Sequence, residues 1–169
     1  APDRADVERE KERLYAPLFV EDGMDWRELN KAVSKAMQNY CGGVKNDMLL
    51  TQGLELLESY EREYVPALSC SNPHELMRAH EVMDILEVCK LIINSCLLRR
   101  SSSVPLCFER SDYPQTDPEE DQCFITIYQE DGEIRSRRVP KRYYGDVKAG
   151  YEAHNQDYMK EEAGLYEEN

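Results

Sequence analysis

Two arginines and one aspartate follow the most apolar segment of the chain, and these residue types form strong ion pairs. Arg99 stands at the end of that segment, and Arg110 and Asp112 come shortly before Pro114. A guanidinium group can bind a carboxylate through two parallel hydrogen bonds, so these side chains could lock a loop onto the end of a helix. Two interpretations follow: the residues brace the local fold, or they brace an adjacent domain.

A cluster of basic residues lies further along an otherwise acidic chain. Its members are Arg135, Arg137, Arg138, Lys141 and Arg142. Charged side chains on an edge strand discourage aggregation, and they can also contact an anionic partner surface. The candidate junction and partner-contact residues are therefore Arg99, Arg110, Asp112, Arg135, Arg137 and Arg138.

The sequence suggests no catalytic, cofactor-binding or metal-binding residue. It contains neither a Gly-x-Gly-x-x-Gly motif nor a Walker-type loop for nucleotide phosphates. His74 and His80 are too far apart for a metal pair on one helical face, and the third histidine, His154, lies beside an acid and two tyrosines. The acidic run at positions 117–121 matches no calcium-loop pattern, so we expect a solvated loop there.

Composition limits the classes of function. A length of 169 residues suits one domain with an appended tail, and a net charge of −13 argues against nucleic-acid binding. The six cysteines include no Cys-x-x-Cys pair, which is typical of reduced core thiols in a cytosolic protein. The longest apolar run, Leu91–Leu98, is too short to span a bilayer. We expect a cytoplasmic protein without direct membrane insertion, held at most at the membrane face by partner subunits.

Three helices are expected to position the candidate residues. Apolar spacings of three and four predict one helix from Asp25 to the Gly42-Gly43 pair, a second from about 47 to 64, and a third from Asn72 to Leu98. Short connections favour antiparallel neighbours. The third helix is apolar nearly all round over Ile85–Leu98, which indicates that it is central in the fold or that another domain covers it.

The pattern changes to strand formers beyond Pro114. Cys123–Tyr128 and Glu133–Val139 can pair around Asp131-Gly132, a strong hairpin signal. The predicted fold class is mainly α: a three-helix antiparallel bundle followed by a small β-hairpin and a polar tail. The predicted divisions are a lead-in at 1–24, the helical bundle at 25–114, the loop and hairpin at 115–144, and an acidic tail at 145–169.

The third helix and its exit resemble the helical C-terminal domain of the succinate dehydrogenase/fumarate reductase flavoprotein family. Members share Arg-x-Glu-Ser-Arg at a helix end, then Arg-x-Asp, an aromatic residue and often Pro. The matching residues are Arg99, Ser102, Arg110, Asp112, Tyr113 and Pro114. The spacing from Arg99 to Asp112 is two residues longer than in the dehydrogenases and resembles the adenylylsulfate reductase α subunit. Ser101 replaces the usual Glu and Ser103 the usual Arg, which suggests a divergent branch.

The resemblance, which covers about residues 25–158, implies a C-terminal fragment of an FAD-dependent oxidoreductase. In that family FAD and the substrate-binding residues belong to the flavin and capping domains, so no catalytic residue carries over and this chain itself holds no cofactor. The implied partners are the flavin domain of the same parent protein and an iron–sulfur protein subunit.

Two other classes of function stay open at this point. The chain could be a free-standing helical adaptor that binds another protein, or, less in keeping with the sequence, a small independent enzyme. A Gly-x-Gly-x-x-Gly motif after a strand upstream of Ala1 would favour the flavoprotein, whereas a start codon there would favour the adaptor.

Overall fold

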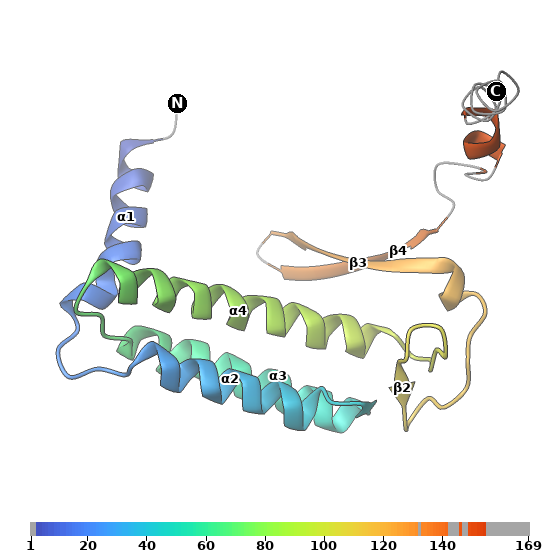
Figure 1. Ribbon diagram of the computed structural model, residues 1–169, viewed down its shortest axis with the longest axis horizontal. Helices are drawn as coiled ribbons and strands as arrows, with labels where there is room; N and C mark the ends of the chain where they lie inside the picture. Colours follow the sequence, from blue (N-terminus) through green and yellow to red (C-terminus); the bar gives the residue numbers. More distant parts are fainter. Residues whose placement is uncertain (1–2, 132, 142–145, 147–148, 155–169) are drawn as a thin grey trace, which may run out of the picture.

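Three long helices make up the body of the computed structural model, which describes residues 3–131, 133–141, 146 and 149–154. The helices α2 (Trp26–Tyr40), α3 (Asp47–Glu63) and α4 (Pro73–Leu98) lie side by side in up-down-up order (Figure 1). Helix α1 (Arg4–Tyr15) precedes them, buries no residue and stands away from the bundle. The predicted mainly α fold with an antiparallel three-helix bundle is confirmed.

Each bundle helix begins at a polar residue that caps it. The cap side chain accepts a hydrogen bond of 2.7–3.0 Å from a backbone N–H two or three residues later. These bonds satisfy donors that have no partner within the first helical turn. The caps are Asp25, Asn46 and Asn72. Two of them were evident from the sequence, and Asn46 lies one residue before the predicted start of α3.

The core lies between the three helices and is almost entirely aliphatic. Its fully buried side chains include Leu29 and Val33 from α2, Leu50 and Leu57 from α3, and Ala79 and Ile93 from α4. Gly53 lets α3 approach α2 closely, because a Cβ atom at this position would lie 2.6 Å from the Cβ of Tyr40. The core therefore fixes the ends of α2, α3 and α4 relative to one another.

The hairpin forms where the sequence predicts it. Strand β3 (Cys123–Glu130) pairs antiparallel with β4 (Glu133–Pro140), and Asp131 adopts the positive φ of 53° that such turns favour. Gly132, the other predicted turn residue, lies outside the described residues, as does the part of the acidic tail at 155–169. The hairpin runs along the side of α4 that faces away from α2 and α3 (Figure 1).

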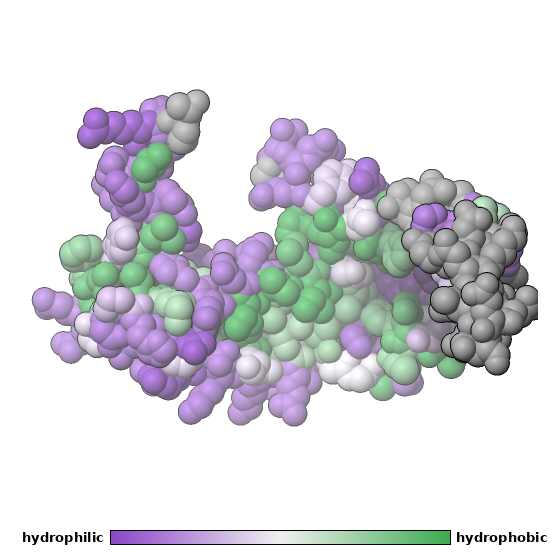
Figure 2. All heavy atoms as spheres, turned by 45° about the horizontal axis from the view of Figure 1, so that its top comes forward, coloured by the Kyte–Doolittle hydropathy of each residue, from purple (hydrophilic) through white to green (hydrophobic). Residues whose placement is uncertain are grey.

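One face of α4 leaves apolar side chains exposed. Ile85, Val88 and Ile92 are 44%, 52% and 44% exposed, and their spacing places them on one side of the helix. We call these three residues the α4 stripe. Apolar surface also gathers between the hairpin and the bundle (Figure 2). That another domain covers this surface stays a prediction.

None of the described helices combines the length and the apolar character that crossing a membrane requires.

Candidate functional site

Arg110 occupies the centre of a buried junction where the ends of three elements meet. Its side chain is completely buried, and each of its five N–H groups donates a hydrogen bond. Nε and Nη2 form a two-point contact with the carboxylate of Asp112 at 2.8 and 2.7 Å. Nη2 also reaches Asp47 at 2.5 Å. Of the two arginines that the sequence offers to Asp112, Arg110 forms the ion pair, and Asp47 adds a second carboxylate.

The remaining donors of Arg110 serve the end of α4. Nη1 donates to the carbonyl oxygens of Cys96 and Arg99 at 2.7 and 2.8 Å. The last carbonyl groups of a helix have no partner within it, and they carry partial negative charge. A buried guanidinium at this position satisfies both requirements. Arg110 thus acts as the C-terminal cap of α4.

Asp112 performs the complementary task at the start of α3. Its Oδ2 accepts a hydrogen bond of 2.7 Å from the backbone N–H of Asp47, the first residue of α3. The hydrogen bonds from Arg110, joined by that of the Asp47 N–H, lower the pKa of Asp112 to about 2. The ring of Tyr113 packs against the guanidinium of Arg110, with its centroid 4.9 Å from Cζ. The Arg-x-Asp-aromatic sequence therefore ties the end of α4 to the beginning of α3.

The lowered pKa makes the contribution of Asp112 dependent on pH. Its carboxylate stabilises the fold fully above the unfolded-state pKa near 4, and this contribution is lost as the pH falls towards about 2. Because the side chain is 28% exposed, we expect Asp112→Asn to lower the free energy of unfolding by only about 1–2 kcal/mol at pH 7.

Chemical denaturation at a series of pH values measures this difference. The gap between wild type and Asp112→Asn should shrink between pH 4 and pH 2. The control is Asp6→Asn, which changes an exposed aspartate on α1 that pairs only with Arg9. A gap that stays constant over this pH range would contradict the ionised role of Asp112.

A second set of contacts ties the exit of α4 to the hairpin. Arg99 is 7% exposed and donates to Asp121 at 2.5 Å. Glu120 is 6% exposed and accepts hydrogen bonds from Ser101 at 2.6 Å and from Arg138 at 2.5 Å. Burial favours a raised pKa for Glu120, but the bonds from Ser101 and Arg138 outweigh it and lower the pKa.

These contacts correct the prediction of a solvated loop at positions 117–121. Glu120 is buried, and Asp121 is ion-paired. The sequence suggested a solvated loop because acidic runs usually face water. The basic partner of Glu120, Arg138, lies 18 positions away on strand β4. Ser101 stands where the family usually has Glu, and its hydroxyl donates a hydrogen bond to the Glu120 carboxylate.

The basic cluster does not form one continuous patch. Arg138 turns towards Glu120, and Lys141 donates to the backbone carbonyl of Asp121. Arg135 pairs with Glu130 at 2.8 Å, whereas Arg137 lies over the ring of Tyr128. The structure therefore divides the cluster into residues that contact the junction and residues that contact other side chains of the hairpin. Arg142 lies outside the described residues.

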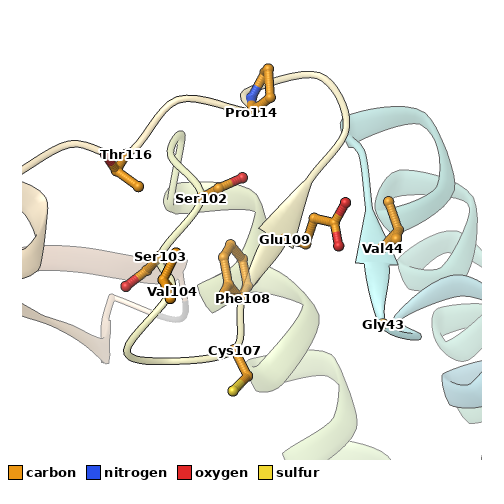
Figure 3. A pocket seen from close by; sticks show the side chains of 10 residues that line it. All are labelled: Gly43, Val44, Ser102, Ser103, Val104, Cys107, Phe108, Glu109, Pro114 and Thr116. Carbon is orange, nitrogen blue, oxygen red and sulfur yellow. The ribbon is translucent and has the colours of Figure 1, made fainter.

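A shallow groove of about 580 Å³ opens beside the junction (Figure 3). Strand β1 (Val44–Lys45) forms one wall, where it pairs in parallel with β2 (Glu109–Arg110). The other wall is the turn from Ser103 to Phe108, which presents Val104 at 81% exposure. Among the described residues that line the groove, Glu109 is the only charged one. The groove also presents the apolar side chains of Val44, Val104 and Phe108.

No metal centre is evident in the described part of the chain. Among those residues, no group of three or more His, Cys, Asp or Glu side chains is close enough to hold a metal ion. His80 hydrogen-bonds through Nε2 to the carbonyl of Leu14, a contact that links α4 to α1. His80 and the junction residues thus make structural contacts within the described part of the chain.

Comparison with known proteins places this geometry in a family. Residues 30–151 match the profile of the family described as fumarate reductase flavoprotein C-term. The chain belongs to this family, and the class of protein is therefore the C-terminal domain of a flavoprotein dehydrogenase or reductase. No curated protein sequence matches the chain.

Solved structures with the same fold include three flavoprotein enzymes. Adenylylsulfate reductase from Archaeoglobus fulgidus is 25% identical with a TM-score of 0.74, and the match covers 83% of this chain and 25% of that one. The Mycobacterium smegmatis Sdh1 complex is 19% identical, with a TM-score of 0.64 and coverages of 83% and 25%. Escherichia coli quinol fumarate reductase FrdA is 16% identical, with a TM-score of 0.66 and coverages of 83% and 26%. The chain spans about a quarter of the length of the solved chains that it matches.

Proposed function

We propose that this chain is the helical, non-catalytic domain of an FAD-dependent oxidoreductase, and that it packs on the flavin domain of the same parent protein. The parent would move two electrons between a substrate and FAD. The α4 stripe carries the proposal, because three large aliphatic side chains of the longest helix lie exposed on one face. Contiguous exposed apolar surface of this kind is typical of an interface between domains.

The junction supports this function by making the contact surface rigid. Arg110 and Asp112 hold the ends of α4 and α3, and Arg99 holds the base of the hairpin through Asp121. These hydrogen bonds therefore fix the positions of the helix and the turn that carry the α4 stripe and Val104. Rigid presentation lowers the entropy that is lost when two surfaces dock.

The hairpin is the proposed site for a second partner, an iron–sulfur protein subunit that exchanges electrons with the flavin. Arg137 is exposed, and the Arg135 side chain is 46% exposed. These cations stand on a chain whose net charge is −13, so they are basic groups on a predominantly acidic protein. An acidic edge on the partner would complement them.

FAD is proposed to belong to the parent protein and not to this chain. The pyrophosphate of a dinucleotide needs a glycine-rich backbone loop, a helix N-terminus or basic side chains. Among the described residues that line the groove at the junction, the only charged one is Glu109, which would repel phosphate. Where FAD is bound in the parent, its isoalloxazine ring supplies the redox chemistry, and the residues of this chain supply only support.

We therefore expect the purified chain to bind no FAD. Titration of FAD with the chain should leave the flavin fluorescence and the visible absorbance bands unchanged. The positive control is the same titration with a flavin domain of this family, which should quench the fluorescence. A purified chain that is yellow, with the absorbance band of bound flavin, would contradict the proposal.

A further inference from the structure

Two cysteine side chains meet where the end of α2 lies against the end of α4. The Sγ atoms of Cys41 and Cys96 are 3.9 Å apart. Cys41 is the C-cap residue of α2 and is half-buried, whereas Cys96 is buried in the last turn of α4. A disulfide requires an S–S distance of about 2.05 Å, so closure needs a small movement of the two side chains towards each other.

The surroundings make the two thiols unequal. The hydrogen-bond contact between the two thiols lowers the pKa of Cys41 to about 7, helped by the charge of Lys45. The same contact, together with burial, raises the pKa of Cys96. Lys45 is held in place by a hydrogen bond of 2.6 Å from Nζ to the carbonyl of Gly42. Cys41 therefore has thiolate character near neutral pH, and Cys96 keeps its proton.

We propose that Cys41 and Cys96 form a reversible dithiol–disulfide site that is oxidised by a hydroperoxide. The Cys41 thiolate attacks one oxygen of the hydroperoxide, the O–O bond breaks, and the leaving oxygen takes a proton to become water or an alcohol. Cys41 is then a sulfenic acid. The sulfur of Cys96 attacks the sulfur of Cys41, the S–O bond breaks, and the hydroxyl leaves as water with the proton of Cys96.

The balance of this reaction is simple. Two thiols lose two electrons and two protons in forming one disulfide, and the hydroperoxide gains them. A thiol or dithiol reductant reverses the change by exchange at the exposed side of Cys41. The site is independent of the proposed packing on a flavin domain, because both sulfurs belong to the bundle itself.

The disulfide would join the two helix ends that surround the junction. It would link the end of α2 to the residue whose carbonyl oxygen accepts a hydrogen bond from Arg110. A cross-link between positions 41 and 96 restricts the unfolded chain, and it should raise the Tm by about 5–15 °C. Oxidation would thus make the end of α4, the helix that carries the α4 stripe, more rigid.

The test uses the purified, fully reduced protein and hydrogen peroxide in slight excess. We expect the intact mass to fall by two hydrogen atoms, a peptide map to show Cys41 linked to Cys96, and dithiothreitol to reverse both changes. Cys96→Ser should leave Cys41 as a sulfenic acid that dimedone traps. Cys41→Ser should form no intramolecular disulfide.

Cys107→Ser is the matched control, because Cys107 is exposed and would react first if accessibility alone decided the outcome. This variant should form the same cross-link at the wild-type rate. Three results would overturn the proposal: a protein that keeps all its thiols, a disulfide that joins other cysteines, or a Cys96→Ser variant without dimedone adduct at Cys41.

Discussion

Replacing Arg110 with alanine will lower the free energy of unfolding by about 3–5 kcal/mol, the largest effect that we expect from any single change. The substitution removes five hydrogen bonds from a fully buried group. It leaves the carboxylates of Asp47 and Asp112 without their shared cation. Chemical denaturation followed by far-UV circular dichroism measures the loss.

Arg110→Lys separates geometry from charge and keeps the test informative if the alanine variant fails to fold. An ammonium group has three donors in a compact arrangement, so it cannot bind Asp112 at two points and also reach the end of α4. We expect a loss of about 2–3 kcal/mol for this variant.

The matched control for both Arg110 variants is Arg135→Ala, which removes an exposed arginine that pairs with Glu130 on the surface. It should change the stability by less than about 0.5 kcal/mol. Equal stabilities of Arg110→Ala and Arg135→Ala would show that the junction does not hold the helix ends together.

The second large effect concerns the α4 stripe and the proposed flavin domain. Val88 is 52% exposed in the centre of the stripe. In the isolated chain, Val88→Glu should change the free energy of unfolding by less than about 0.5 kcal/mol. The side chain at this position already faces water, and Glu favours the helical conformation. In the proposed interface the same carboxylate would be buried without a partner, so affinity for the flavin domain should fall by about 30-fold or more.

Isothermal titration of the chain with a separately produced flavin domain measures this affinity. The control is Val7→Glu, which introduces the same charge at an exposed apolar position of α1. It should bind as the wild type does. If Val88→Glu binds with unchanged affinity, the stripe is not the contact surface.

The sequence was sufficient to predict the three long helices, the hairpin and an arginine partner for Asp112. Apolar periodicity and polar caps predicted the three helices, and Asp131-Gly132 predicted the hairpin, because these signals are local. An ion pair of Asp112 with either Arg99 or Arg110 was also predictable, since the three residues lie within one short segment. Local signals of this kind can be interpreted without knowledge of the tertiary contacts.

The remaining contacts could not be predicted because their partners are distant in the sequence. Asp47 lies 63 positions from Arg110, and nothing in its neighbourhood distinguishes it from an ordinary first-turn acid. The sequence predicted that Glu120 faces water, because its partners Ser101 and Arg138 lie close to it only in the folded chain. The predicted domain divisions at residues 24, 114 and 144, the flavin-domain partner and the iron–sulfur partner stay predictions.

The most direct test of the central claim is hydroxyl-radical footprinting of the chain, alone and joined to the flavin domain of its parent protein. We expect the oxidation of Ile85, Val88 and Ile92 to fall several-fold in the joined state, while Val7 on α1 is oxidised at an unchanged rate. Equal oxidation of the three stripe residues in both states would contradict the claim that this chain packs on a flavin domain through α4.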